Sequence, residues 1–135
     1  RSLVEAGFPT KNILLVGVRN SQLQENSFLK EHNIRRISMN HFLNDLPETC
    51  DTLMEFSNGK ELYVSIDIDV IDPAFARSTF YKEPGGFTSR QFIYLIQRIN
   101  KIKTLRAVDI VEINEKEDKN NLTLKLGAKI LSELL

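Results

Sequence analysis

Short aliphatic segments alternate with longer amphipathic segments along the whole chain, and this alternation limits the possible folds more than any other feature. The aliphatic segments are too short for helices, and their β-branched residues are typical of buried strands. Strands that alternate with helices are joined by crossover connections and lie parallel to one another. The sequence therefore predicts an α/β fold with a parallel sheet between two layers of helices. The expected strands are residues 12–19, 34–38, 61–70 and 105–112.

The expected helices are residues 21–30, 41–56, 88–101 and 121–135. Ser21 and Thr88 stand at N-cap positions of the first and third helices, because their hydroxyl oxygens accept backbone N–H groups. Pro47 is expected to divide the second helix into two pieces. Apolar faces at helical spacing are expected from Phe92, Leu95, Ile96 and Ile99 in the third helix, and from Leu122, Leu126, Ile130 and Leu134 in the fourth.

Composition excludes several classes of protein. The 135 residues carry 18 Lys and Arg against 18 Asp and Glu, so the chain has no basic excess to attract nucleic acid or an anionic membrane. Its longest apolar runs are about five residues, well below the roughly 18 to 20 that a membrane span requires. The single cysteine, Cys50, cannot form an internal disulfide and is expected to be a buried structural thiol. We therefore expect a cytoplasmic protein without a nucleic-acid or membrane partner, and a length that suits one domain or part of one.

Two aspartates lie near the end of the strongest predicted strand. Side chains alternate across a strand, so Asp67 and Asp69 are expected on one face, about 6.6 Å apart along the backbone. Two ionised carboxylates in such a place repel each other unless a cation lies between them. Oxygen ligands favour hard ions such as Mg²⁺, Mn²⁺ or Ca²⁺, and ligands bind beyond the carboxyl ends of parallel strands. The pattern predicts a metal site; the alternative is that both aspartates are surface residues paired to nearby Lys or Arg.

A second predicted strand also ends in acids, Asp109 and Glu112. If this strand lies beside the first, Glu112 approaches the same rim of the sheet as Asp69. A carboxylate there could bind a cation. The alternative is a glutamate that ends the strand and faces solvent.

These acids belong to a longer pattern. The sequence SIDIDVIDPAFA at residues 65–76 is followed by EPGGFTSR at residues 83–90 and by DIVEIN at residues 109–114. Together these segments resemble the signature of the ureohydrolases, the family of arginase, agmatinase and formimidoylglutamase. The segment VGVR at residues 16–19 resembles a strand end of the same family, so the resemblance spans nearly the whole chain. The segment DPAFA resembles agmatinases more than arginases.

The resemblance implies hydrolysis of a small guanidino or formimino substrate at a centre of two Mn²⁺ ions, which lower the pKa of the water that they share. Asp67 matches the family's aspartate that bridges both metal ions, and Asp69 the aspartate that binds one of them. Glu112 matches the glutamate that binds the substrate's guanidinium group. Asp72 and Pro73 are assigned to loop structure, and Gly85 and Gly86 to a tight turn. An arginase-like three-layer fold, a homo-oligomer and a role in arginine or polyamine metabolism are also implied.

Part of the family's pattern is absent. The GGDHS and DAHxD segments, which supply the family's other metal ligands, do not occur in these 135 residues. His32 and His41 lie in predicted helices and are expected to have surface or core roles. The sequence therefore predicts that residues 1–135 are the C-terminal half of a single ureohydrolase-like catalytic domain. Without the proton-transferring group and the other ligands, this chain alone contains no catalytic residue and is expected to be inactive.

One loop departs from the family's pattern and leaves the function open. The family's usual sequence APGTGTPEPGG is replaced at residues 76–86 by ARSTFYKEPGG, in which bulkier side chains replace small residues of the family's loop. Because this loop approaches the site, the substrate is not fixed by the resemblance. One alternative is a non-catalytic structural or regulatory protein in which residues 77–82 block the site. Another is an unrelated Mg²⁺-dependent phosphoryl-transfer domain that uses the same two aspartates.

Overall fold

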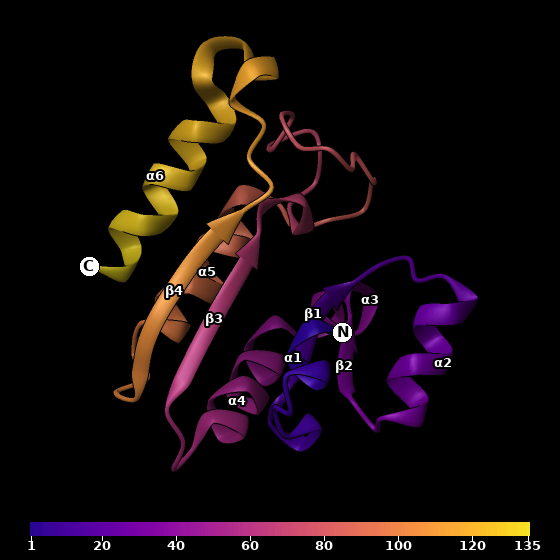
Figure 1. Cartoon of the computed structure of the whole chain (residues 1–135). Helices are drawn as coiled ribbons and strands as arrows, with labels where there is room; N and C mark the ends of the chain where they lie inside the picture. The colour runs from indigo at the N-terminus through magenta and orange to yellow at the C-terminus, as the bar shows by residue number, and fades with distance from the viewer. The chain divides into compact units, whose positions relative to one another are not determined.

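The computed structural model describes all 135 residues, which form two compact units, Arg1–Asn44 and Asp45–Leu135 (Figure 1). Each unit contains one sheet of two parallel strands together with helices, so the predicted α/β class with parallel strands is confirmed. No helix combines the length and the apolar character needed to cross a membrane.

The first unit is built on a short parallel sheet. Strand β1 (Leu14–Val18) pairs with β2 (Arg35–Ser38), and Val16 lies opposite Ile37. Helix α2 (Leu23–Glu31) connects the two strands. The other elements of the unit are α1 (Ser2–Glu5), η1 (Thr10–Asn12) and α3 (Met39–Asn44). Its buried apolar side chains are Ile37, Met39 and Phe42.

Helix α2 begins later than the sequence predicts. Gln22 is the N-cap residue, and its backbone N–H donates to the Glu25 carboxylate at 2.8 Å. A side chain from the first turn thus accepts the N–H group that the helix itself leaves without a partner. Ser21 lies one residue too early to cap, and its hydroxyl donates to Asn26 Oδ1 at 2.8 Å. The prediction of Ser21 as the N-cap is therefore wrong.

The second unit contains the longer parallel pair, β3 (Leu62–Asp67) and β4 (Leu105–Val111), with Ser65 opposite Asp109. Helix α5 (Ser89–Ile99) connects these strands and lies behind them in Figure 1. It packs against α4 (Leu46–Ser57) and α6 (Leu122–Leu134). The short helices of this unit are η2 (Ile68–Val70), η3 (Glu115–Glu117) and η4 (Lys119–Asn121).

The predicted break at Pro47 is confirmed. Helix α3 ends at Asn44, and α4 begins at Leu46 with Pro47 in its first turn. Asp45 caps α4, because its carboxylate accepts the backbone N–H of Glu48 at 2.9 Å. Cys50 lies on α4 and is buried, as the sequence predicts.

Helix α5 follows its predicted pattern closely. The hydroxyl of Thr88 accepts the backbone N–H of Gln91 at 3.2 Å, and the side chain of Gln91 accepts the backbone N–H of Thr88 at 3.0 Å. This reciprocal capping box fixes the start of the helix. The predicted apolar face is confirmed, because Phe92, Leu95, Ile96 and Ile99 are all buried.

The buried face of α6 differs from the prediction. Leu122 is 45% exposed, and the fully buried positions are Thr123, Gly127 and Ile130. The carboxylate of Asp118, which precedes the helix, accepts hydrogen bonds from the backbone N–H groups of Thr123 and Leu124 in its first turn. Gly127 allows a close approach to the preceding chain, because a Cβ there would lie 3.0 Å from Ile113 Cδ1. Of the predicted face, Ile130 is buried and Leu126 and Leu134 are half-buried, so the prediction is wrong at Leu122.

Candidate functional site

The carboxyl ends of β3 and β4 lie side by side in the second unit. Asp67 is opposite Val111 in the parallel register, so Glu112 follows at the same end of the sheet as Asp67. Both arrowheads point to this end in Figure 1, where the irregular segments after each strand begin. The prediction that the two acid-bearing strands are neighbours is confirmed.

Asp67 and Asp69 are brought together by a turn. Strand β3 ends at Asp67, and Asp69 lies within η2, where the backbone N–H of Asp69 donates to Asp67 Oδ1 at 3.1 Å. The expectation that strand alternation places both on one face is therefore wrong. The chain turns at Asp67 because its carboxylate caps the short helix, and the turn leaves Ile68 completely buried.

The chemistry of these two acids fits a hard divalent cation such as Mn²⁺. Asp67 is exposed and Asp69 is half-buried, and Asp67 uses Oδ1 for the turn, which leaves Oδ2 as a ligand atom. No group of three or more His, Cys, Asp or Glu side chains comes together in the structure. A metal ion held by Asp67 and Asp69 thus needs further ligands from elsewhere.

Glu112 directly follows β4 and has an uncommon backbone conformation. Its φ angle is 66°, in the left-handed region that residues other than glycine seldom adopt. Such strain is often found at functional sites, where the surrounding structure maintains it. Nothing in the sequence indicated this conformation.

Asp109 lies within β4, opposite Ser65, and not at the strand end. The Tyr63 hydroxyl donates a hydrogen bond to its carboxylate. This bond, followed by the effect of Ser65, lowers the pKa of Asp109. The same bond is the main reason why the pKa of Tyr63 is raised. Sequence reasoning missed Tyr63, although it shares the alternating face of Asp67.

Asp72 holds the base of the loop that follows η2. Its carboxylate accepts the backbone N–H groups of Ala74 at 2.9 Å and of Gly85 at 2.8 Å, which joins the two ends of the loop. Gly85 has a φ angle of +84°, which suits glycine. The predicted structural roles of Asp72 and Gly85 are confirmed.

Ser78 fixes the same loop to the end of β4. Its hydroxyl donates to the Asn114 carbonyl at 2.5 Å, and the Asn114 N–H donates back to the Ser78 carbonyl at 2.9 Å. The backbone N–H of Ser78 donates to the Thr123 hydroxyl at 3.1 Å. The loop therefore connects the segment after Asp69 with the segment after Glu112. Ser78 replaces a glycine of the family's usual loop, and no sequence signal indicated its bonds.

Neither histidine lies in the unit that contains the aspartates. His32 is half-buried at the end of α2, with its ring 4.3 Å from the Phe28 ring. His41 is exposed on α3. These placements agree with the predicted surface or core roles.

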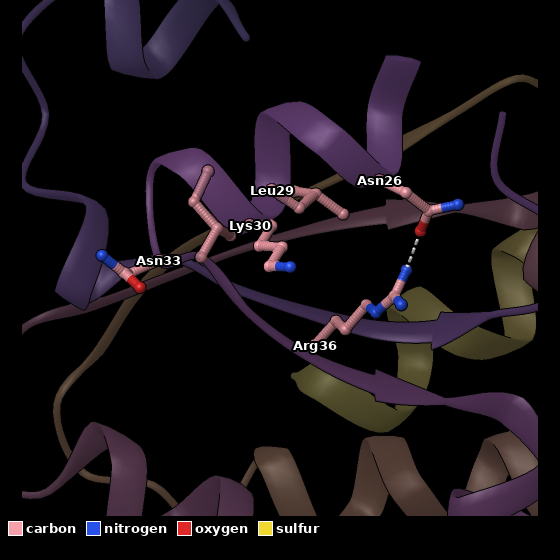
Figure 2. Close-up of a pocket in the computed structure, with 6 residues that line it drawn as sticks. Asn26, Leu29, Lys30, Asn33 and Arg36 are labelled. Carbon is pink, nitrogen blue, oxygen red and sulfur yellow. Dashed lines mark hydrogen bonds between the residues drawn. The ribbon is translucent and has the colours of Figure 1, made fainter. Parts of the chain in front are cut away.

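An open crevice in the first unit has a different chemistry (Figure 2). It is lined by Asn26, Leu29, Lys30, Asn33, Ile34 and Arg36. Figure 2 shows the Arg36 guanidinium group directed at Asn26, whose side-chain oxygen accepts its hydrogen bond. With two cations and no carboxylate, this crevice does not suit a metal ion, and it includes none of the predicted site residues.

The arginase family model matches residues 1–135, so the chain belongs to the arginase family. It is 31% identical over 123 residues to the proclavaminate amidinohydrolase of Streptomyces clavuligerus, and 26% identical over 125 residues to an arginase of Staphylococcus aureus strain MRSA252. These matches cover 89% and 90% of this chain but 39% and 41% of the relatives. The chain thus spans about two fifths of the length of these curated relatives.

A solved structure supports the same fold. The formimidoylglutamase of Bacillus subtilis superposes with a TM-score of 0.91, covering 99% of this chain and 44% of that chain at 19% identity. At this identity the likeness shows the fold alone. The predicted arginase-like α/β fold is confirmed, with this chain as one portion of it.

Proposed function

We propose that residues 1–135 form part of a metal-dependent hydrolase of the agmatinase or arginase type, which cleaves a guanidino or formimino group. The observation that carries the proposal is the position of Asp67, Asp69 and Glu112, which all follow the carboxyl ends of two paired parallel strands at the same end of the sheet. Membership of the arginase family supports this chemistry, and it argues against the unrelated phosphoryl-transfer domain.

Each acid has a separate proposed role. Asp67 and Asp69 bind the metal pair, and Glu112 accepts hydrogen bonds from the planar guanidinium group of the substrate. When bound, two Mn²⁺ ions supply a water of lowered pKa and stabilise developing negative charge. Glu112 has a left-handed backbone and directly follows Val111, the last residue of β4.

The remaining metal ligands and the proton-transferring group are expected from outside these residues. Two aspartates are too few for a complete binuclear centre, and the curated relatives are about two and a half times as long as the matched region. We therefore expect the 135-residue chain alone to hydrolyse nothing. We also expect the complete protein to be a cytoplasmic homo-oligomer that binds a small substrate and neither nucleic acid nor membrane.

The test uses protein in which these residues are joined to the rest of an arginase-family domain. Manganese content is measured by mass spectrometry, and hydrolysis is measured with agmatine, arginine, guanidinobutyrate and formiminoglutamate. We expect about two Mn²⁺ per site and hydrolysis of at least one substrate. Asp69→Asn should lower both, whereas Glu115→Gln, which changes an acid three residues beyond Glu112, should lower neither.

The rival function is a non-catalytic protein in which residues 77–82 block the site. This alternative rests on the bulk of Phe80 and Tyr81, which are aromatic residues of this segment. A protein that hydrolyses none of the four substrates, and whose manganese content is unchanged by Asp69→Asn, would support the rival and contradict the proposal.

A further inference from the structure

We infer that Phe80 and Tyr81 form an aromatic wall at the candidate site and select guanidino substrates whose far end is apolar or aromatic. The far end is the part of the substrate that does not react. This inference rests on the proposed function, because it concerns the substrate of the same site.

The first step is the place of the loop. Its base begins three residues after Asp69, where Asp72 joins the backbone of Ala74 to that of Gly85. Its middle is fixed at Ser78 to Asn114, two residues after Glu112. The loop therefore runs from the end of the strand that carries the aspartates to the end of the strand that carries the glutamate. Ligands of open parallel sheets bind at this end.

The second step is the burial of successive residues in the loop. Ala76, Ser78 and Thr79 are at most 1% exposed, whereas Phe80 is 68% and Tyr81 is 74% exposed. The Thr79 hydroxyl donates to the Tyr81 carbonyl at 2.8 Å, which closes a turn around Phe80. Smaller side chains already fill the space beneath the loop, so the rings face outward. The packing of this chain therefore leaves two adjacent rings uncovered, and contiguous exposed apolar groups mark surfaces that other molecules or segments contact.

The third step is the charge beside the rings. Lys82 follows Tyr81 and forms an ion pair with Glu117 at 3.2 Å, so a compensating acid already lies beside its positive charge. The candidate site itself is acidic. These surroundings favour an apolar far end over a carboxylate, and aromatic rings attract apolar and aromatic groups.

Arg77 provides the competing explanation. It is exposed on the other side of Ser78 along the chain, and its guanidinium group could bind a substrate carboxylate. If Arg77 governed selectivity, the preferred substrate would be a guanidino acid. The two explanations predict opposite orders of affinity.

The experiment compares 2-phenylethylguanidine, agmatine and 4-guanidinobutyrate on manganese-loaded protein that contains the rest of the arginase-family domain. Dissociation constants are measured calorimetrically at low temperature, and kcat/KM is measured separately. The variants are Phe80→Gly combined with Tyr81→Thr, and Arg77→Ala. Phe75→Ala is the control, because Phe75 is 40% exposed on the same loop but precedes the buried Ala76.

We expect the unmodified protein to bind 2-phenylethylguanidine about tenfold more tightly than 4-guanidinobutyrate, and the double variant to lose this preference. The two single variants should retain it. The inference is overturned if the double variant keeps the preference, if Arg77→Ala alone abolishes it, or if the double variant lowers only the melting temperature. Ring-dependent binding without hydrolysis of any guanidine would uphold the inference and contradict the proposed function.

Discussion

The Tyr63 hydroxyl donates a hydrogen bond to the Asp109 carboxylate across β3 and β4. The two residues are diagonal neighbours, since Tyr63 lies opposite Ala107 in the register. The hydrogen bond favours the ionised carboxylate and so lowers the pKa of Asp109. Tyr63→Phe removes the donor and should raise this pKa toward its ordinary value. The measurement is a titration of the Asp109 carboxyl carbon by NMR.

The control for this prediction is Tyr94→Phe, on α5, which should leave the titration of Asp109 unchanged. The sign for stability follows from the lowered pKa in the folded state. The stabilisation is present above the pKa of unfolded aspartate and is lost as pH falls through the folded value. Tyr63→Phe should therefore destabilise the chain at neutral pH, and the difference should shrink in acid. A constant difference at all pH values would contradict the assignment.

Thr88 should contribute to stability through its hydroxyl group. Thr88→Ala removes the oxygen that accepts the Gln91 N–H at 3.2 Å, and we expect a loss of about 1 kcal/mol in the free energy of unfolding. Thr88→Ser keeps the oxygen and should lose much less. Urea denaturation of the three proteins checks this; equal losses in both variants would instead implicate the methyl group.

Gly127 should not tolerate a large side chain. A Cβ at this position would already lie 3.0 Å from Ile113 Cδ1, so Gly127→Leu should force the helix and the preceding chain apart. We expect a cost of about 1 to 3 kcal/mol in the free energy of unfolding. Ala128→Leu is the matched control, because Ala128 is exposed on the same helix. Similar stability of the two variants would contradict the close approach.

Cys50 should react slowly with thiol reagents in the folded chain. Burial raises the pKa of its thiol from 9.0 to about 11, so at pH 8 the thiolate is about a hundredfold scarcer than in an unfolded chain. Rapid labelling in concentrated guanidinium chloride is the control, since Cys50 is the one cysteine. The raised pKa also means that stability falls as pH rises above the unfolded value. Equally fast labelling in both states would contradict this burial.

Elements whose residues repeat with one clear period could be predicted from the sequence. The prediction of the buried face of α5 was correct because its apolar residues recur at helical spacing between a capping threonine and a polar end. These residues are Phe92, Leu95, Ile96 and Ile99. The face of α6 was predicted only in part, because leucines recur on more than one side of that helix and Leu122 is exposed. There the contact of Gly127 with Ile113 and the cap by Asp118 decide which side is buried.

The site could be predicted in composition but not in geometry. The pairing of β3 with β4 followed from the alternation of strands and helices. The turn at Asp67 did not, because it depends on a side-chain hydrogen bond that ends the strand two residues before Asp69. Likewise, the left-handed conformation of Glu112 is imposed by the surrounding chain and has no local sequence signal.

The attachment of the loop after η2 affects which of its residues can be substituted during evolution. The bonds at Asp72 and Ser78 are made largely to backbone groups, and none involves the side chains of Phe80 or Tyr81. Those two side chains can therefore be exchanged while the path of the loop is retained. Substitution of these two residues alone could then change the substrate selectivity that we infer for the loop. Residues 80 and 81 are therefore suitable positions for randomised libraries.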